Sequence, residues 1–376
     1  MARWRARGGR PGPIVNIAHL ELGRHQYGGA LQVRHLLNAL EDGVHNHRLV
    51  TAAGSDLHAW AEAEDQPHAA LKFRGEHDVM FVVRLARWLR ANRIDLLHVH
   101  SRRGADWMGP LAAGVGGAAC ILTRRVDHPP PLWLRWMVAR RYLRVVGISD
   151  AISTVLRDGG IEDDALLTIR SAIDPVRIDA APTVDVRTLI PGCSEDAPVI
   201  AVIAQLIDRK GHRFLIEGLG GLRAKFPDLQ VAFFGRGGLR KELETAVHAA
   251  GHADCVWFAG FRDDLLSLLP SVSVVVHPAV REGLGVSLLQ AAAARVPVVG
   301  FATGGLTEAV VHEHTGLLVR VGDAVALSAA ISRILADDEL ASRLGDNGRR
   351  RIEAEFSIPV MARRYAALYD VLAEEI

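Results

Sequence analysis

A loop in the second half of the chain holds the residues with the clearest chemical potential. It follows an apolar run that ends at His277, and it contains Glu282, Gly283 and Gly285. We expect a helix to begin near Gly285, because unpaired N–H groups and the positive dipole end at a helix N-terminus favour an anion. Glycines let the backbone approach that anion closely, while the Glu282 carboxylate accepts hydrogen bonds from hydroxyl groups. The loop predicts an anion site beside a hydroxyl-binding carboxylate, with an ordinary glycine-assisted turn as the alternative.

A second cluster of charged residues comes directly after another apolar run and reads Asp208-Arg209-Lys210-Gly211-His212. Lysine is scarce, since the chain has only four lysines in 376 residues. We expect Lys210 where a diphosphate would meet the N-terminus of a helix, and a fixed cation there stabilises the charge of a leaving group. A solvated pair of cations at a helix start is the alternative interpretation.

Two common nucleotide-binding motifs are incomplete or absent. The glycines in Gly235-Arg236-Gly237-Gly238 follow a strand-like run, but Arg240 stands where a dinucleotide fingerprint has its third glycine. No lysine follows a glycine anywhere in the sequence, so the chain has no P-loop. These observations disfavour a nicotinamide dehydrogenase and a P-loop NTPase.

Apolar runs of strand length alternate with helical periodicity throughout the chain. In the first half, strands are expected at 14–18, 48–52, 95–100, 119–123 and 145–148, and helices at 33–44, 79–89 and 133–143. In the second half, strands are expected at 199–204, 231–235, 256–258, 272–277 and 296–300, and helices at 213–225, 239–249, 286–294 and 305–311. Repeated alternation predicts an α/β protein with mostly parallel sheets covered on both faces.

The alternation is interrupted between Asp174 and Pro198 by four prolines. We therefore expect two Rossmann-like domains facing each other across a cleft, because ligands bind beyond the carboxyl ends of the strands in open α/β sheets. The expected divisions are a basic flexible tail at 1–12, an N-terminal domain at 13–174, a linker at 175–198, a C-terminal domain at 199–357 and a final helix at 358–376.

Composition and charge limit the function classes further. Hydrophobic residues make up 49% and charged residues 23%, as in ordinary globular proteins. The net charge of +1 and the lack of a reader motif disfavour nucleic-acid binding. Three widely spaced cysteines form neither a disulfide framework nor a metal knuckle. We expect a cytoplasmic protein, since no apolar run suits a secretory signal or a membrane span.

Taken in order, the motifs resemble the family 4 retaining glycosyltransferases of the GT-B fold, the glycosyl transferases group 1. The resemblance extends over nearly the whole chain. In the second half its motifs are Arg209-Lys210-Gly211, Phe234-Gly235-Arg236-Gly237, Gly260-Phe261-Arg262-Asp263, Glu282-Gly283-Leu284-Gly285, Pro297-Val298-Val299 and Gly304-Gly305-Leu306-Thr307-Glu308. In the first half they are Gly28-Gly29, His98-Val99-His100, Ser149 and Asp174. The helix at 361–372 resembles the one that crosses back onto the N-terminal domain in this fold.

The resemblance implies transfer of a sugar from a nucleotide diphosphate sugar to a hydroxyl of a glycan or lipid-linked acceptor. It implies retention of the anomeric configuration and a role in cell-envelope polysaccharide or lipopolysaccharide assembly. It assigns the acceptor to the N-terminal domain and the donor to the C-terminal domain. No metal or other cofactor is expected, because fixed cations and a helix dipole would neutralise the diphosphate.

The resemblance also implies roles for single residues. Arg209 and Lys210 would hold the diphosphate, and Glu282 would bind hydroxyls of the donor sugar. Arg262 would line the base pocket. Two short segments would approach the donor through their backbone, namely Gly28 with Gly29 and the amides of Gly283, Leu284 and Gly285.

Three positions depart from the family pattern. The second acidic residue of the paired motif is replaced by Gln290, which accepts from a ribose hydroxyl without a charge-assisted bond, so we expect weaker donor binding. Gln205 replaces an arginine, and we expect Arg209 to compensate. The usual acceptor-side histidine near residue 123 is missing. The candidates to replace it are His100, Arg102, Arg103, Arg125 and Asp127.

Several alternatives stay open. His100 is either a catalytic candidate or a structural histidine at a strand end. The segment 127–143 contains Trp133 and Trp136 among arginines, so it either docks peripherally at the inner face of a membrane or packs its tryptophans into the core. The alternatives to a transferase are a nucleotide-sugar epimerase or a phosphorylase on the same fold and a non-catalytic nucleotide-sugar-binding partner subunit.

Overall fold

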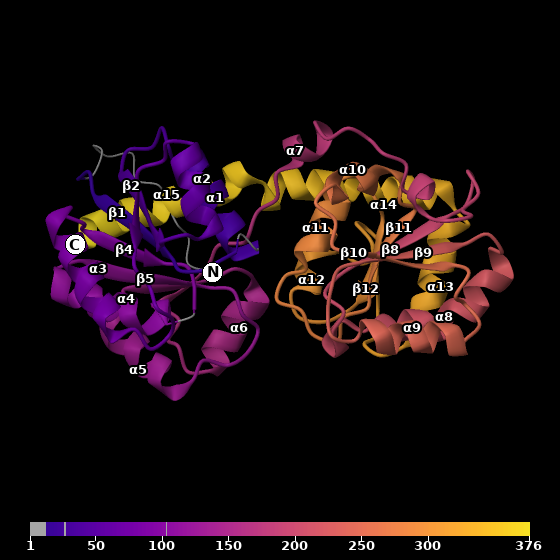
Figure 1. Cartoon of the computed structure of the whole chain (residues 1–376), viewed down its shortest axis with the longest axis horizontal. Helices are drawn as coiled ribbons and strands as arrows, with labels where there is room; N and C mark the ends of the chain where they lie inside the picture. The colour runs from indigo at the N-terminus through magenta and orange to yellow at the C-terminus, as the bar shows by residue number, and fades with distance from the viewer. Residues whose placement is uncertain (1–12, 26–27, 103) are drawn as a thin grey trace.

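The computed structural model describes residues 13–25, 28–102 and 104–376, so the expected basic tail and the candidate Arg103 lie outside the described residues. Each half of the described chain is built around a parallel β-sheet, and the two halves lie side by side along the long axis of the molecule (Figure 1). The α/β class and the two-sheet organisation expected from the alternating pattern are confirmed.

The first sheet contains seven strands within the described residues, in the order β3-β2-β1-β4-β5-β6-β7. Its strands are β1 (Asn16–Glu21), β2 (Asn46–Ala52), β3 (His68–Leu71), β4 (Leu96–Val99), β5 (Ala119–Arg124), β6 (Arg144–Gly147) and β7 (Leu166–Thr168). Its helices are α1 (Gly28–Ala39), α2 (Asp56–Ala63), α3 (Val79–Ala91), α4 (Ala105–Gly116), α5 (Leu132–Arg141) and α6 (Asp150–Asp158). The strand order reverses between β1 and β4, which is where a doubly wound sheet forms its ligand crevice.

The second sheet contains six strands within the described residues, in the order β10-β9-β8-β11-β12-β13. Its strands are β8 (Val199–Ile203), β9 (Gln230–Phe234), β10 (Val256–Gly260), β11 (Val274–His277), β12 (Val298–Phe301) and β13 (Leu317–Val319). The helical segments around it are η2 (Asp208–Lys210), α8 (His212–Lys225), α9 (Arg240–Ala249), α10 (Leu265–Leu268), η3 (Leu269–Ser271), α11 (Val286–Ala293), α12 (Leu306–Ala309), α13 (Ala324–Leu335), α14 (Asp338–Arg351) and η4 (Ile352–Phe356). Here the order reverses between β8 and β11.

Several boundaries differ from the sequence expectations. The first strand, expected at 14–18, runs from Asn16 to Glu21 because His19 and Glu21 are polar and yet buried. The helix expected at 33–44 ends at Ala39, and Val44 is 56% exposed. The helix expected at 305–311 is only the four-residue α12. Apart from the segment 175–198, the helices and strands that were not expected are α2, β3, α4, α6, β7, α10, β13, α13 and α14.

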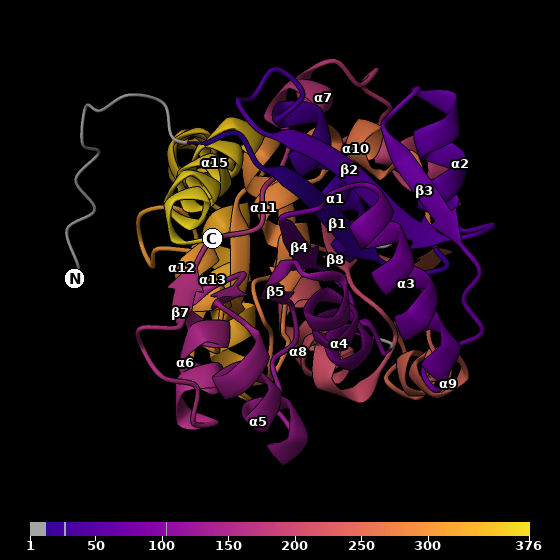
Figure 2. The same ribbon diagram turned by 90° about the vertical axis from the view of Figure 1, so that its left-hand side faces the viewer.

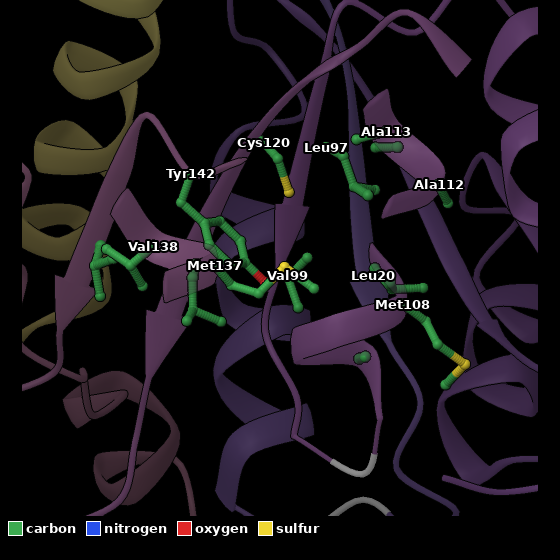
Figure 3. Packing of buried hydrophobic residues seen from close by; sticks show 14 of the residues in the cluster. Leu20, Leu97, Val99, Met108, Ala112, Ala113, Cys120, Met137, Val138 and Tyr142 are labelled. Carbon is green, nitrogen blue, oxygen red and sulfur yellow. The ribbon is translucent and has the colours of Figure 1, made fainter. Parts of the chain in front are cut away.

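Helix α4 shows why some elements escape a periodicity search. It contains Pro110 and three glycines, which are weak helix formers. Its small residues let it lie close to the sheet, because a Cβ on Gly109 would stand only 2.7 Å from Val99 Cγ2. In Figure 3 Leu20, Val99, Met108 and other buried side chains of this core pack together. Tertiary packing therefore stabilises this helix although its local helix propensity is low.

The segment 175–198, expected as a linker, forms α7 (Pro175–Asp179) and η1 (Val186–Leu189). Its residues Ile178, Val186 and Ile190 are buried in the core of the second half. The chain ends in α15 (Ile358–Glu375), which returns to the first half and lies beside its sheet (Figure 2). Residues of α15 pack with β1, β4 and β6 in one apolar cluster. The expected return of the final helix to the N-terminal half is confirmed.

Candidate functional site

A cavity of about 340 Å³ is lined by residues from both halves of the molecule. Its walls come from the loops that follow the strand ends, as expected for facing doubly wound sheets. From the first half it is lined by Gly28, Gly29, Gln32, Arg125, Val126, Asp127, Ile148 and Ser171. From the second half it is lined by Arg209, Lys210, Glu282, Gly283, Leu284, Gly285, Val286 and Ser287. The structure therefore brings most of the candidate residues into one cavity.

The Glu282 carboxylate is the centre of a buried polar network in this cavity. Its Oε2 atom forms an ion pair with Lys210 Nζ and lies 2.9 Å from His277 Nε2. Its Oε1 atom accepts a hydrogen bond from the Gly283 amide at 3.2 Å. Ser287 Oγ lies 3.4 Å from the other nitrogen of the His277 ring. Glu282 is thus held in one orientation by partners from β11, from η2 and from the loop before α11.

Electrostatics keep this network in a defined charge state. Burial raises the pKa of Glu282, but the His277 hydrogen bond and the Lys210 charge outweigh it and hold the pKa well below its usual range. Burial lowers the pKa of His277 more than its bond to Glu282 raises it. At neutral pH the network consists of an ionised Glu282 carboxylate and a neutral His277 imidazole.

Two glycines allow the loops around Glu282 to pack this closely. Gly211 has a φ of +69°, and a Cβ at this position would lie 1.9 Å from the Pro278 carbonyl oxygen. Gly304 has a φ of +46°, and a Cβ there would lie 2.3 Å from the Glu282 carbonyl oxygen. Since neither conformation nor spacing suits a larger residue, these glycines fix where Lys210 and Glu282 meet.

Arg125 and Asp127 bring charge from the first half to the same cavity. Asp127 Oδ2 lies 3.4 Å from Arg281 Nε and 4.0 Å from Arg209 Nη1, so it bridges the two halves. Arg125 Nη1 donates to Ser171 Oγ at 3.3 Å. The guanidinium of Arg209 therefore faces an acidic partner across the cleft.

Four candidates do not line this cavity as the described residues form it. Gln290 lies half-buried on α11 without lining it, and Arg262 is held by Asp264 with an Nε–Oδ1 distance of 2.8 Å. His100 and Arg102 instead line a neighbouring cavity in the first half. The roles implied for Gln290 and Arg262 at a ribose and a base stay predictions.

Comparison with known proteins identifies the family. The sequence profile of the family "Glycosyl transferases group 1" matches residues 190–351. The chain is 30% identical over 187 residues to the putative glycosyltransferase EpsD of Bacillus subtilis, and 32% identical over 173 residues to the lipopolysaccharide core biosynthesis glycosyltransferase LpsE of Rhizobium meliloti. These matches take in 49% and 46% of this chain, and about half the length of each relative, 49% and 50%.

A longer match decides the question. The 2-deoxystreptamine N-acetyl-D-glucosaminyltransferase of Streptomyces fradiae is 30% identical over 308 residues, which is 74% of this chain and 69% of that protein. The chain is a group 1 glycosyltransferase.

Solved structures agree on the fold of this glycosyltransferase. The Anabaena protein HepE, solved in complex with UDP and glucose, has a TM-score of 0.82 and 19% identity, covering 95% of this chain and 100% of that one. A Rickettsia africae glycosyltransferase has a TM-score of 0.83 and 18% identity, covering 96% and 100%. At this identity the likeness concerns the fold alone, and it confirms the GT-B architecture.

The candidate His100 belongs to a buried histidine cluster on the first sheet. His100 Nε2 lies 3.0 Å from His19 Nδ1, and the other ring nitrogen of His19 lies 3.0 Å from His47. His98 contacts the hydroxyls of Tyr369 and Thr123, each at 2.7 Å. Burial lowers the pKa values of His19, His98 and His100, so the three rings are neutral. The cluster ties the sheet to α15, which favours the structural interpretation of His100.

This histidine cluster is also one of two groups among the described residues whose ligand atoms lie close enough to hold a metal ion. The second group consists of His58, Glu62 and His68. Both nitrogens of His19 and of His98 already have partners in the protein. A metal in the first group would have to break some of those hydrogen bonds.

The glycosyltransferase has a direct contact between its halves that the sequence did not reveal. Ser149 caps α6 and donates its hydroxyl to the Gly283 carbonyl at 2.7 Å. Glu308 accepts hydrogen bonds from the amides of Asp150 and Ala151 at 2.7 and 2.5 Å. A carboxylate of the second half therefore complements the positive end of a helix in the first half. The paired residues are 134 to 158 positions apart in the sequence, so no local pattern points to this contact.

Sequence reasoning also missed His277 as the partner of Glu282. The only local sign is that this histidine ends the buried strand β11, where a polar residue needs a partner. Arg124 was missed as well, because at 3% exposure it lies beneath the surface of the first half. Both residues can be assigned to a site only from the folded structure, because their partners lie in loops that are distant in the sequence.

Helix α5 leaves two tryptophans on the surface. Trp133 is 45% and Trp136 is 51% exposed, and the Arg140 guanidinium lies 5.0 Å from the Trp136 ring. The alternative in which these tryptophans pack into the core is therefore wrong. Across the described part of the chain, no helix has both the length and the apolar character that a bilayer crossing requires.

Proposed function

We propose that this glycosyltransferase moves a sugar from a nucleotide diphosphate sugar to a hydroxyl of a glycan or lipid-linked acceptor, with the anomeric configuration retained. The proposal includes a place in cell-envelope polysaccharide or lipopolysaccharide assembly, which the likeness to LpsE supports. The observation that carries it is the meeting of Lys210 and Glu282 in a cavity lined by both halves. A nucleotide diphosphate sugar needs a cation beside its diphosphate and a hydrogen-bond acceptor beside its sugar hydroxyls, and Lys210 and Glu282 supply these two groups.

In the proposed mechanism the diphosphate lies against Lys210, Arg209 and the amides at the start of α11. Transfer breaks the bond between the anomeric carbon and a diphosphate oxygen, and the nucleotide diphosphate leaves with the bonding electron pair. The acceptor oxygen forms the new bond on the face that the diphosphate leaves, which retains the configuration, and its proton passes to an oxygen of the departing diphosphate. The fixed cations stabilise the developing negative charge without reorganisation, which is a large source of catalysis. Glu282 orients the donor sugar by accepting from its hydroxyls.

The most direct test is a transfer assay on single substitutions. Lys210→Ala removes the countercharge and Glu282→Ala removes the hydroxyl acceptor, so each should lower kcat by about 100-fold or more. Lys241→Ala is the matched control, since Lys241 is exposed on α9 and outside this cavity. Circular dichroism checks that the variants stay folded. Full activity of the Lys210 or the Glu282 variant would refute the site assignment.

The same assay tests the remaining parts of the proposal. A chelator should leave the rate unchanged, because Arg209, Lys210 and the helix amides supply the positive charge. A strict metal requirement contradicts this mechanism. Product analysis with donor alone should show no epimerised sugar, whereas an epimerase would need no acceptor. Donor binding without transfer to any acceptor would instead support a non-catalytic partner subunit.

Peripheral membrane contact is proposed for the exposed face of α5. Leu132, Trp133 and Trp136 are exposed beside the arginines of the same helix, and such a combination suits the interface of an anionic bilayer. Replacing both tryptophans by serine should reduce co-sedimentation with vesicles that contain anionic lipid. Unchanged sedimentation would argue against contact through α5.

A further inference from the structure

A second cavity, of about 250 Å³, lies within the first half at the carboxyl ends of β1, β4 and β5. It shares Gly29, Arg125 and Val126 with the cavity described above, so the two are neighbours. Four guanidinium groups line it, from Arg24, Arg102, Arg124 and Arg125. The carboxylates among its lining residues belong to Glu21 and Asp106. The lining thus carries an excess of positive charge.

Two of these arginines have buried donors that the protein does not use. Among the described residues, Arg124 Nε and Arg125 Nε have no hydrogen-bond partner, and neither has His100 Nδ1. Arg124 and His100 are each only 3% exposed. Buried polar groups are almost always paired, because an unsatisfied donor is costly. Arg124 and Arg125 both line this cavity, so their unsatisfied guanidinium N–H groups favour a ligand that accepts hydrogen bonds.

The surroundings hold these donors in place. Arg124 Nη2 donates to the His128 carbonyl at 3.1 Å, and Arg102 Nη1 lies 2.6 Å from His128 Nε2. Glu21 Oε1 accepts from the Gly23 amide at 2.8 Å, which engages that oxygen with the backbone. Asp106 is 7% exposed; burial raises its pKa, while the charges of Arg124 and Arg102 lower it. Since two carboxylates face four guanidinium groups in this lining, the guanidinium groups are only partly neutralised.

We propose that this cavity binds a phosphoryl group of the acceptor, and that the enzyme selects acceptors that carry one. The inference rests on the proposed function, since it places the acceptor hydroxyl beside the donor cavity at Arg125. Guanidinium groups bind phosphate oxygens through paired, charge-assisted hydrogen bonds. Arginines that converge from β5 and from two separate loops suit a tetrahedral oxyanion better than a planar carboxylate. A cationic aminocyclitol acceptor is disfavoured by the same charges.

Calorimetry on the nucleotide-saturated enzyme tests the proposal. The donor cavity is first filled with whichever of UDP, GDP, ADP and CDP the wild type binds best. Under these conditions myo-inositol 1-phosphate should bind, and myo-inositol should bind at least about tenfold more weakly. Arg102→Gln and Arg124→Gln should each weaken the phosphate probe about tenfold. Arg140→Gln, an exposed arginine on α5 outside both cavities, is the matched control and should bind like the wild type. Because Arg124 is buried, Arg102→Gln decides the case if the Arg124 variant fails to fold.

Two results would overturn the proposal: equal affinity for the phosphorylated and plain probes, or unchanged affinity in the folded variants. A failure of the proposed function looks different, because none of UDP, GDP, ADP and CDP would then bind the wild type. In that case the phosphate probe is titrated without a nucleotide. Weaker binding to Arg102→Gln but not to Arg140→Gln would still support the phosphate site.

A second arm identifies the source of the phosphate. Phosphatidylcholine vesicles with and without phosphatidylinositol are compared for binding to wild type and Arg102→Gln. Binding that needs phosphatidylinositol and falls in the variant assigns the site to a lipid headgroup. Binding of the soluble inositol phosphate alone assigns it to a free sugar phosphate. Either pattern supports a phosphoryl site. The proposal is contradicted if neither probe shows binding that depends on Arg102.

Discussion

The Lys210–Glu282 pair shows how single residues are prepared for the donor. A positive and a negative group occupy one cavity wall, so each lowers the energy of burying the other. A diphosphate entering the cavity offers Lys210 a second anionic partner, while Glu282 keeps its bond to His277. The pair therefore holds both side chains in position without a large rearrangement. His277 acts through Glu282 and is a positioning residue.

The role of His277 can be measured directly. His277→Phe should lower kcat/KM about ten- to 100-fold, because Glu282 loses the hydrogen bond that orients its Oε2 atom. His277→Gln keeps a donor at a similar reach and should recover part of the loss. Thermal unfolding of both variants controls for a change in stability. Equal activity of the Phe and Gln variants would show that the hydrogen bond does not position Glu282.

The candidate residues could be predicted to the extent that they sit in short loops after apolar strands. Lys210 and Glu282 carry local signals, namely charge beside glycine at a strand end. His277 and Arg124 carry almost none, since each gains its role from partners that the fold brings close. Gln290 is the opposite case, because it has a sequence signal but no place in the cavity. Its spacing from Glu282 indicates the donor site, yet it lies on α11 and does not line the cavity.

Among the elements, α15 follows the second half in the chain and packs its buried side chains against the first sheet. Its residues Tyr365 and Tyr369 are buried against the first sheet, and they contact the histidine cluster through Thr123 and His98. The Tyr369 hydroxyl and the His98 imidazole form a hydrogen bond in this buried contact, which fixes how α15 lies on the sheet. The same junction makes the stability of the protein depend on pH.

Stability should fall as the pH is lowered from about 6.5 toward 4. Burial lowers the pKa of His47 to about 4 and those of His19, His98 and His100 well below 6.5. In this range the unfolded chain binds protons that the folded chain does not, so each histidine costs up to about 1.4 kcal/mol per pH unit. Urea unfolding at pH 7.5 and 5.5 measures the effect, and His47→Asn should reduce it. Identical unfolding free energies at both pH values would contradict this assignment.

Elements with clear hydrophobic periodicity were predictable, and others were not. Nine of the thirteen strands in the described residues lie within two residues of expectation, whereas β1 ends three residues later and β3, β7 and β13 were not expected. Helix α4 is rich in glycine and contains Pro110, so only its packing against α3 and the sheet makes it helical. The end of β1 was not predictable either, because it contains the polar residues His19 and Glu21. Their burial depends on partners that are distant in the sequence.

In the whole molecule, the contact between α6 and Glu308 sets how the two halves meet. Burial raises the pKa of Glu308, while the amides of Asp150 and Ala151 lower it. The carboxylate also lies 3.4 Å from Arg170 Nε. Because Ser149 contacts Gly283 beside the donor cavity, this interface connects domain arrangement with the site. No single-domain reading of the sequence predicts it.

Removing the Glu308 carboxylate should loosen this arrangement. Glu308→Ala leaves two amides at the start of α6 without acceptors, which we expect to favour a more open molecule by about 1–2 kcal/mol. Small-angle scattering should report a larger radius of gyration, and transfer should slow. Glu244→Gln, which alters an exposed pair on α9, is the control. An unchanged scattering profile would mean that other contacts set the arrangement.

The central claim is that a nucleotide diphosphate binds in the cavity between the two halves with Lys210 as its countercharge. A thermal-shift panel with UDP, GDP, ADP and CDP first identifies the base, since a ligand at about 100 times its Kd adds about 2.7 kcal/mol. Calorimetry with that nucleotide is then the decisive measurement. We predict that Lys210→Ala weakens binding at least about tenfold and that Lys241→Ala does not. Equal affinity of the two variants for the nucleotide would contradict the account.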